Sequence, residues 1–263
     1  MRLKPPKGTM LSRGHPLARG MVGCWLMNEG TGNIVNDLSG NGNVGIITSA
    51  LWSPGKFGPC VKFDGNYDFI TIGDVAILEG MPGITVSAWI NPSAVPSVVR
   101  GIATKFWDGT NRSWSLIINS TGNVHFFCST DSQNDNDLAS ANGVVSANIW
   151  EHYVGVWSSG DTTIRLYRNG ILQATTASQP GATVRTNTTK VCIGDRFYNG
   201  TNQDFFIGQI DDVMIYNRAL SATEVQQLYM TPFRMFEREP IELWTGAYAP
   251  TAEDINIYVY DTE

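Results

Sequence analysis

The sequence has few charged residues and no cluster of basic ones. Charged residues make up 16% of the 263-residue chain, and the formal net charge is −6. A nucleic-acid-binding surface needs a dense group of Lys and Arg, so nucleic acid is not expected as a partner. The mild acidity fits a solvated surface that would also tolerate calcium.

Long apolar runs are also missing. A membrane-spanning helix needs about 20 consecutive apolar residues, and no such stretch exists here. The first twenty residues, MRLKPPKGTMLSRGHPLARG, are basic but lack the apolar centre of a secretory signal. We expect a protein made in the cytoplasm without a signal peptide. It would stay in that cell, or leave it by lysis or as part of a particle.

The motifs of metal clusters and common enzymes are absent as well. The four cysteines form no CxxC pair, which excludes a zinc ribbon. Apolar neighbours favour four buried free thiols, although two disulfides remain an alternative by count. The three histidines have no HExxH context, and GxSxG, P-loop and GxGxxG motifs are missing. We expect His152 to be packed or at a rim, and the protein not to be an enzyme.

Strand patterns fill most of the chain instead. Residues 83–92, GITVSAWINP, alternate in the way of a half-buried strand. Asn169-Gly170 is the dipeptide of a type I′ turn and predicts a hairpin in TTIRLYRNGILQAT. Such strands recur about every 8 to 12 residues, which indicates an all-β sandwich or barrel.

One helix is expected, near the end of the strand-rich region. In NRALSATEVQQLYM, Ser221 and Glu224 have the spacing of a capping box, and Pro232 ends the helix. Residues 1–20 form an N-terminal extension that we expect to be irregular. Residues 231–263 form a C-terminal extension with two apolar stretches, IELW and INIYVY. This extension should pack on something, as an edge strand or as a strand that awaits another chain.

The order of several motifs resembles a known group. It is similar to the concanavalin A-like lectin/glucanase superfamily, with the laminin G-like, pentraxin-like jelly roll as its nearest branch, over residues 21–230. The motifs are GMVGCWLMNEGTGNIVNDLSGNGNVG, KFDGNYDFITIG, GITVSAWINP, WEHYVGVW, IRLYRNGIL and IGQIDDVMIYNRALSATEVQQLY. The resemblance implies an all-β fold: a two-sheet antiparallel jelly-roll sandwich with one short helix near the C-terminal end of the domain.

The tail sequence PFRMFEREPIELW resembles laminin G-like proteins carried by bacteriophages and prophages. This resemblance implies a virion-surface protein used for decoration or adhesion, held to virion proteins through its termini. A homo-oligomer, especially a trimer, would suit such a part. Two functions stay open: a lectin-like module for glycans or host-surface polysaccharide, and a purely structural capsid or tail decoration protein.

A glycoside hydrolase is a distant third alternative. Retaining hydrolysis needs two carboxyl groups about 5 Å apart on one face of a cleft. The chain lacks the Glu-x-Asp-x-x-Glu pattern of hydrolytic relatives. Asp211 and Asp212 are adjacent, so on a regular strand without a bulge they point to opposite faces.

A calcium site is predicted from oxygen-rich residues in two segments, which the resemblance makes neighbours: Asp37, Asn41 and Asn43 in one loop, and Asp211 and Asp212. The alternative is that Asp37 and Ser39 only close an Asx-type turn. One of the paired acids should face inward and the other solvent or a neighbouring strand. On a regular strand Asp211 shares a face with Val213 and Ile215, and Asp212 shares one with Ile210 and Met214.

A ligand-binding cluster is predicted in three polar loops. Aromatic faces suit sugar rings, and the acids and amides offer oxygens. The candidates are Trp107, Asp108, Asn111, Asp131, Asp135 and Tyr198. The alternative is plain solvated surface. Trp114 is expected in the core.

Overall fold

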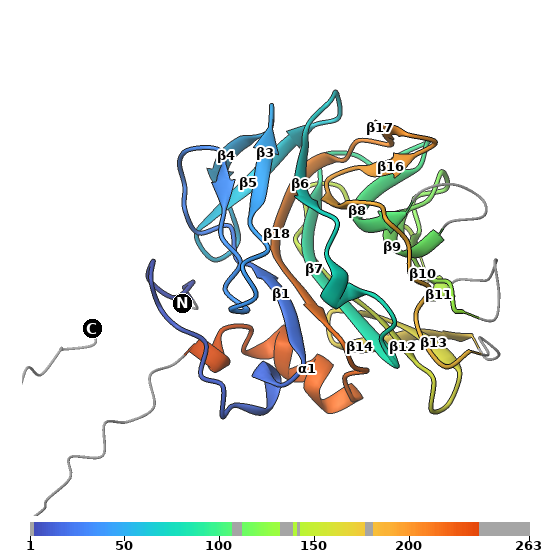
Figure 1. The fold of residues 1–263 in the computed structure, drawn as a ribbon. Helices are drawn as coiled ribbons and strands as arrows, with labels where there is room; N and C mark the ends of the chain where they lie inside the picture. The colour runs from blue at the N-terminus through green and yellow to red at the C-terminus, as the bar shows by residue number, and fades with distance from the viewer. Residues whose placement is uncertain (1–2, 107–111, 132–138, 141–142, 177–180, 237–263) are drawn as a thin grey trace, which may run out of the picture.

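The protein is a sandwich of two antiparallel sheets, seen in a computed structural model (Figure 1). The structure describes residues 3–106, 112–131, 139–140, 143–176 and 181–236. The first sheet has the order β14 (Ile171–Thr176), β13 (Thr163–Arg168), β12 (Glu151–Ser158), β7 (Gly83–Pro92), β18 (Ile207–Tyr216), β5 (Pro59–Asp64) and β4 (Leu51–Pro54), with β1 (Met21–Trp25) also paired to β18.

The second sheet packs across the core from the first. Its order is β11 (Ala139–Ser140), β10 (Val124–Cys128), β9 (Arg112–Ile118), β8 (Arg100–Phe106), β15 (Val191–Ile193), β6 (Phe69–Gly73), β3 (Gly45–Thr48) and β2 (Ile34–Val35). A separate hairpin joins β16 (Arg196–Tyr198) to β17 (Thr201–Gln203). This architecture confirms the predicted jelly-roll sandwich.

Local signals in the sequence form as predicted. Asn169 and Gly170 have φ values of 52° and 76°, which a type I′ turn requires, and they join β13 to β14. Helix α1 (Ala222–Met230) begins at Ser221 with both hydrogen bonds of the capping box. It is the one α-helix among the described residues, beside the short 3-10 helices η1 (Pro16–Ala18), η2 (Ala76–Leu78) and η3 (Arg234–Phe236).

The space between the sheets is a large apolar core. Three tryptophans, Trp25, Trp114 and Trp157, are fully buried there, and the expectation for Trp114 is confirmed. The four cysteines are buried free thiols, as the sequence favours. The sheets approach closely at Gly155 of β12, where an added Cβ would lie 2.0 Å from the ring of Phe126.

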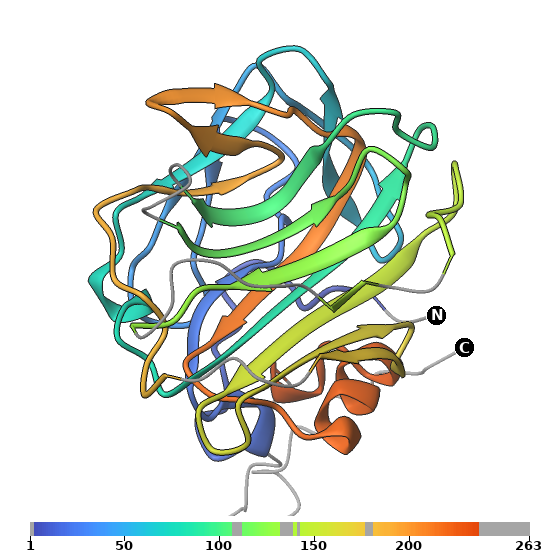
Figure 2. The same cartoon turned by 90° about the vertical axis from the view of Figure 1, so that its right-hand side faces the viewer.

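A second apolar cluster covers the outer face of the first sheet. Met214 and Tyr216 of β18 pack there against Leu17 of η1, Leu228 of α1 and Met235 of η3. Both ends of the described chain therefore fold over the same sheet face. They lie on the opposite side of the molecule from the β16–β17 hairpin (Figures 1 and 2).

Candidate functional site

The Asp37 side chain closes its own loop. Its two oxygens accept hydrogen bonds of 2.9 Å from the backbone N–H groups of Cys24, Ser39 and Asn43, and from the Ser39 hydroxyl. The side-chain amides of Asn41 and Asn43 donate to a main-chain carbonyl of β1. The loop thus has the geometry of the turn that the sequence offered as an alternative.

Asp211 and Asp212 lie on the same side of β18, which corrects the prediction for a regular strand. The pairing of β18 with β7 shifts register between Asp211 and Met214. Asp212 has a φ of 48°, so a bulge turns its side chain to the side of Asp211. Both carboxylates lie within salt-bridge distance of one group, the ammonium of Lys4.

The bulge also changes which apolar residues share a face. Ile210, Val213 and Ile215 all face the core between the sheets, whereas Met214 packs in the outer cluster. The prediction that Ile210 and Met214 share a face is wrong because the extra residue resets the alternation. The expectation that one acid faces solvent or a neighbouring strand and the other faces inward is also wrong: both side chains are buried against the Lys4 ammonium, 0% and 1% exposed.

Lys4 supplies the positive charge between these acids. Its Nζ donates to Oδ1 of Asp211 and to the carbonyls of Pro59 and Met27, and lies 3.7 Å from Oδ1 of Asp212. Burial raises the pKa of Asp211 well above its usual range and that of Asp212 to about 6, against the attraction of Lys4. Burial lowers the pKa of Lys4, but the two carboxylates outweigh it and the net shift is upward.

The predicted calcium residues already have hydrogen-bond or ion-pair partners within the protein. Both carboxylate oxygens of Asp37 accept hydrogen bonds from backbone N–H groups, and the ammonium of Lys4 contacts Asp211 and Asp212. No group of three or more His, Cys, Asp or Glu side chains in the described ranges could hold a metal ion. Calcium at these residues stays a prediction, and the geometry fits it poorly.

The predicted ligand cluster is only partly visible. Trp107, Asp108, Asn111 and Asp135 lie outside the described residues. Asp131 is exposed, and its Oδ1 accepts hydrogen bonds from the backbone of Ala182 and Thr183. Tyr198, on β16, is half-buried.

Tyr198 belongs to a group of aromatic and arginine side chains that we call the loop-end cluster: Phe106, Arg112, Phe127, Arg196 and Tyr198. The rings of Phe106 and Tyr198 stack with centroids 6.0 Å apart, and Phe127 meets Phe106 edge-on at 5.9 Å. The guanidinium of Arg196 lies 4.9 Å from the Tyr198 ring centre, and that of Arg112 lies 5.4 Å from Phe106. Such contacts fix the orientation of the two guanidinium groups beside the aromatic rings.

The loop-end cluster encloses the ends of a predicted loop. Phe106 ends β8 and Arg112 begins β9, so residues 107–111 start and finish at cluster members. Ser129 donates its backbone N–H to Ser113, which places Asp131 at the same end of β9. Sequence reasoning missed the four other cluster members because the contacts that join β16 to Phe106 link residues far apart in the sequence. The alternation in RGIATKF and the sequence RFY were the only signals.

The buried carboxyl group of Asp195 is hydrogen-bonded to the β16–β17 hairpin. Asp195 is fully buried and accepts a hydrogen bond from the Asn202 amide. Burial raises the pKa of Asp195 to about 7, although Cys192 and Asn202 act in the opposite direction. Arg196 donates from Nε to Asp204 at 2.7 Å, which fixes its guanidinium beside Tyr198.

His152 is not placed as a catalytic base. Its ring stacks with those of Trp89 and Tyr229, at centroid distances of 5.0 and 6.1 Å, and its Nε2 lies 2.8 Å from the Ser87 hydroxyl. Burial lowers the pKa of this histidine to about 3, so the ring is neutral at physiological pH. The expectation of a packed histidine is confirmed.

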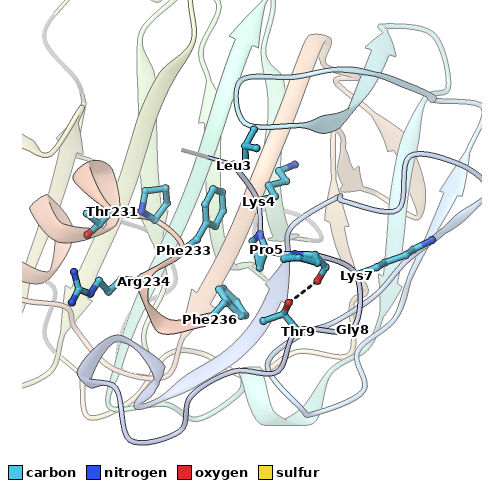
Figure 3. A pocket seen from close by; sticks show the side chains of 12 residues that line it. Leu3, Lys4, Pro5, Lys7, Gly8, Thr9, Thr231, Phe233, Arg234 and Phe236 are labelled. Carbon is cyan, nitrogen blue, oxygen red and sulfur yellow. Dashed lines mark hydrogen bonds between the residues drawn. The ribbon is translucent and has the colours of Figure 1, made fainter. Parts of the chain in front are cut away.

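A cavity of about 590 Å³ lies away from the loop-end cluster, between the N-terminal segment and η3 (Figure 3). Pro5, Lys7 and Thr9 line one side, and Phe233 and Phe236 line the other. The N-terminal segment and η3 also meet through a hydrogen bond, because the backbone N–H of Ser12 donates to the carbonyl of Met235.

A family model described as the concanavalin A-like lectin/glucanases superfamily, of laminin G type, matches residues 64–226. That match spans more than half of the chain. The chain belongs to this superfamily. The matched region contains most of both sheets and the whole loop-end cluster, and the predicted resemblance is confirmed.

Two solved structures to which this chain is similar are binding domains. The binding domain of Paraclostridial Mosquitocidal Protein 1 has a TM-score of 0.66 and 18% identity, over 83% of this chain and 53% of that one. The receptor binding domain of botulinum neurotoxin D has a TM-score of 0.62 and 16% identity, over 83% and 54%. This chain therefore spans about half the length of those two.

Domain 4 of AbnA, an extracellular arabinanase from Geobacillus stearothermophilus solved in complex with arabinotriose, is similar over nearly its full length. Its TM-score is 0.63 at 18% identity, over 80% of this chain and 98% of that domain. A search of curated proteins finds no match. No helix among the described residues is long and apolar enough to cross a membrane. At 16–18% identity, these structures show that the chain shares their fold.

Proposed function

We propose that the protein is a non-catalytic glycan-binding module displayed on a virion surface. The observation that carries glycan binding is the loop-end cluster, in which Tyr198, Arg112 and Arg196 gather around the end of β8 and the start of β9. An aromatic ring offers an apolar face to a sugar, and guanidinium groups donate hydrogen bonds to its hydroxyl or carboxylate oxygens.

The fold supports this choice of surface. Part of the outer face of the first sheet, at β1, β12, β13 and β18, packs against η1, α1 and η3 and is not a free surface. The loop-end cluster lies away from that cover, and three predicted loop segments begin or end near it. The arabinotriose complex of AbnA domain 4 is an example of a sugar bound by this fold.

A glycan array with the full chain tests the binding function. We expect selective binding, and we expect Tyr198→Ala and Arg196→Ala each to weaken it about tenfold, since each removes roughly 1.4 kcal/mol of contact. Leu51→Ala on β4, an exposed leucine in the other sheet, is the matched control and should bind normally. Failure to bind any glycan, or equal binding by all three variants, would overturn the proposal.

Display on a virion is supported by the position of the chain ends. Residues 3–20 and 231–236 meet over one sheet face, so an anchor there would leave the loop-end cluster facing outward (Figure 1). Deletion of residues 237–263, which spares every described side chain, should abolish co-sedimentation with phage particles but keep glycan binding. If the shortened chain still co-sediments, the C-terminal anchor is wrong. If neither form does, virion display is wrong.

A further inference from the structure

The Lys4 side chain ends in a compartment closed to solvent. Its side chain is 3% exposed, and those of Asp211 and Asp212 are 0% and 1% exposed. The walls come from four separate parts of the chain: the N-terminal segment, the turn after β1, the start of β5 and the bulge in β18. An added Cβ on Gly55 would lie 3.0 Å from Oδ2 of Asp211, so the backbone also closes this side.

Hydrogen bonding in this compartment is incomplete. Oδ2 of Asp211 and both oxygens of Asp212 have no hydrogen-bond partner although they are buried. One ammonium cannot neutralise two carboxylates, and an unpaired buried charge is very costly. One of the two acids therefore carries a proton. The compartment holds an amine, a carboxyl group in contact with it and a second carboxyl group beside both.

We propose that Lys4 and Asp211 join through an intramolecular amide bond between Nζ and Cγ, with Asp212 as the proton carrier. Asp211 is the acceptor because Nζ donates to its Oδ1, whereas the nearest oxygen of Asp212 is 3.7 Å away. The backbone N–H of Asp212 also donates to Oδ1 of Asp211, at 3.1 Å, and would stabilise negative charge on that oxygen during the attack.

The step balances without any other reactant. The ammonium first passes one proton to the ionised carboxylate, which leaves a neutral amine and two neutral carboxyl groups. The lone pair of Nζ then attacks Cγ of Asp211. Asp212 accepts a proton from the nitrogen and returns one to the departing hydroxyl. The C–N bond forms, the C–O bond breaks, and one water molecule leaves with Asp212 restored.

Burial favours this product over the separated groups. Amide formation replaces a buried charged pair by a neutral group, and so removes the desolvation cost of both ions. The link would join positions 207 residues apart and tie the N-terminal segment to a central strand. In a chain anchored by its termini, this covalent bond would transmit mechanical force from the N-terminal segment to β18. The bond itself is independent of the proposed function.

Intact mass under denaturing conditions tests the bond. We expect the folded wild-type chain, incubated until its mass is constant, to be lighter than its sequence by one water molecule. Its protease digest should contain one linked peptide pair joining Lys4 to Asp211. A wild-type chain of full mass, with the Lys4 and Asp211 peptides found separately, would overturn the proposal and leave an ordinary buried ion pair.

Variants separate the roles of the three residues. Lys4→Arg keeps a positive charge but has no nucleophilic amine, and Asp211→Ala has no acceptor carbon, so both should show full mass. Asp212→Asn keeps the shape of the side chain but cannot carry protons, so the water-loss form should be absent or should appear at least tenfold more slowly. Water loss at the wild-type rate in Asp212→Asn would overturn the role of Asp212. The wild-type mass decides the bond even if a variant fails to fold.

Discussion

Asp211 and Asp212 are neighbours on one strand, yet both side chains contact the ammonium of Lys4. The left-handed backbone of Asp212 makes this possible, since it inserts one extra residue into the pairing with β7. Adjacent acids on a strand thus form a same-side pair, but a buried one. The pair contacts Lys4 of the N-terminal segment.

Removal of the Lys4 side-chain nitrogen should destabilise the fold strongly, because it removes the buried ion pair and, with it, any amide bond to Asp211. Lys4→Met keeps the aliphatic stem but leaves two buried carboxyl groups without their partner. Loss of one member of a buried ion pair costs about 3–5 kcal/mol. Urea denaturation should show a loss of this size, whereas Lys7→Met, an exposed lysine in the same segment, should stay within about 0.5 kcal/mol of wild type. Equal stabilities of the two variants would contradict the buried contact.

Asp195 should make the protein less stable as the pH rises through the weakly acidic range. Burial raises its pKa to about 7, so the folded state keeps a proton that the unfolded chain loses near its ordinary pKa of 3.8. Stability therefore falls between about pH 4 and pH 7, by on the order of 4 kcal/mol, and is level above that range.

Urea denaturation of Asp195→Asn across this range provides the measurement. The substitution should reduce the slope between pH 5 and pH 7; the slope that remains comes from Asp211 and Asp212, whose pKa values burial also raises. Asp161→Asn is the control. The hydrogen bond from Arg165 lowers the pKa of Asp161, so the contribution of Asp161 to stability changes with pH only in a more acidic range. A slope that persists unchanged in Asp195→Asn would show that this carboxyl group is ionised in the folded protein.

The parts of the fold that sequence could predict are those encoded by neighbouring residues. The Asn169-Gly170 turn needs two positive φ angles that this dipeptide tolerates, and the capping box depends on a spacing of three residues. The bulge at Asp212 depends on a backbone angle that no alternation pattern encodes. The Lys4 contact joins residues 207 positions apart, and only the assembled fold could show it.

The same distinction applies to the candidate site. Tyr198 was found because it lies in a polar loop with an aromatic ring. Its partner Phe106 lies on β8 and Phe127 lies on β10, so their meeting depends on how β16 packs against the second sheet. The sequence also could not predict that the terminal segments pack over the first sheet, because residues 3–20 contain only the short helix η1 and so show no periodic apolar pattern.

Loss of the capping box should destabilise α1, which packs on the outer face of the first sheet. Ser221 accepts from the backbone N–H of Glu224, whose carboxylate accepts in turn from the Ser221 backbone. Ser221→Ala removes a helix cap and should cost about 1 kcal/mol in thermal or urea unfolding. Thr223→Ala, an exposed position in the first turn of α1, should have a much smaller effect. A Ser221→Ala variant as stable as Thr223→Ala would show that α1 is held by packing alone.

Calcium should leave the thermal stability of the protein unchanged. A ligand that binds only the folded state stabilises it by about 2.7 kcal/mol at a hundredfold excess over its dissociation constant, which would raise the melting temperature clearly. The oxygens of Asp37 already accept four hydrogen bonds, and the ammonium of Lys4 contacts Asp211 and Asp212. Melting curves with calcium and with a chelator should therefore superimpose. A shift that Asp37→Asn abolishes would instead establish calcium at this loop, and it would require the Asp37 side chain to exchange its backbone donors for the metal ion.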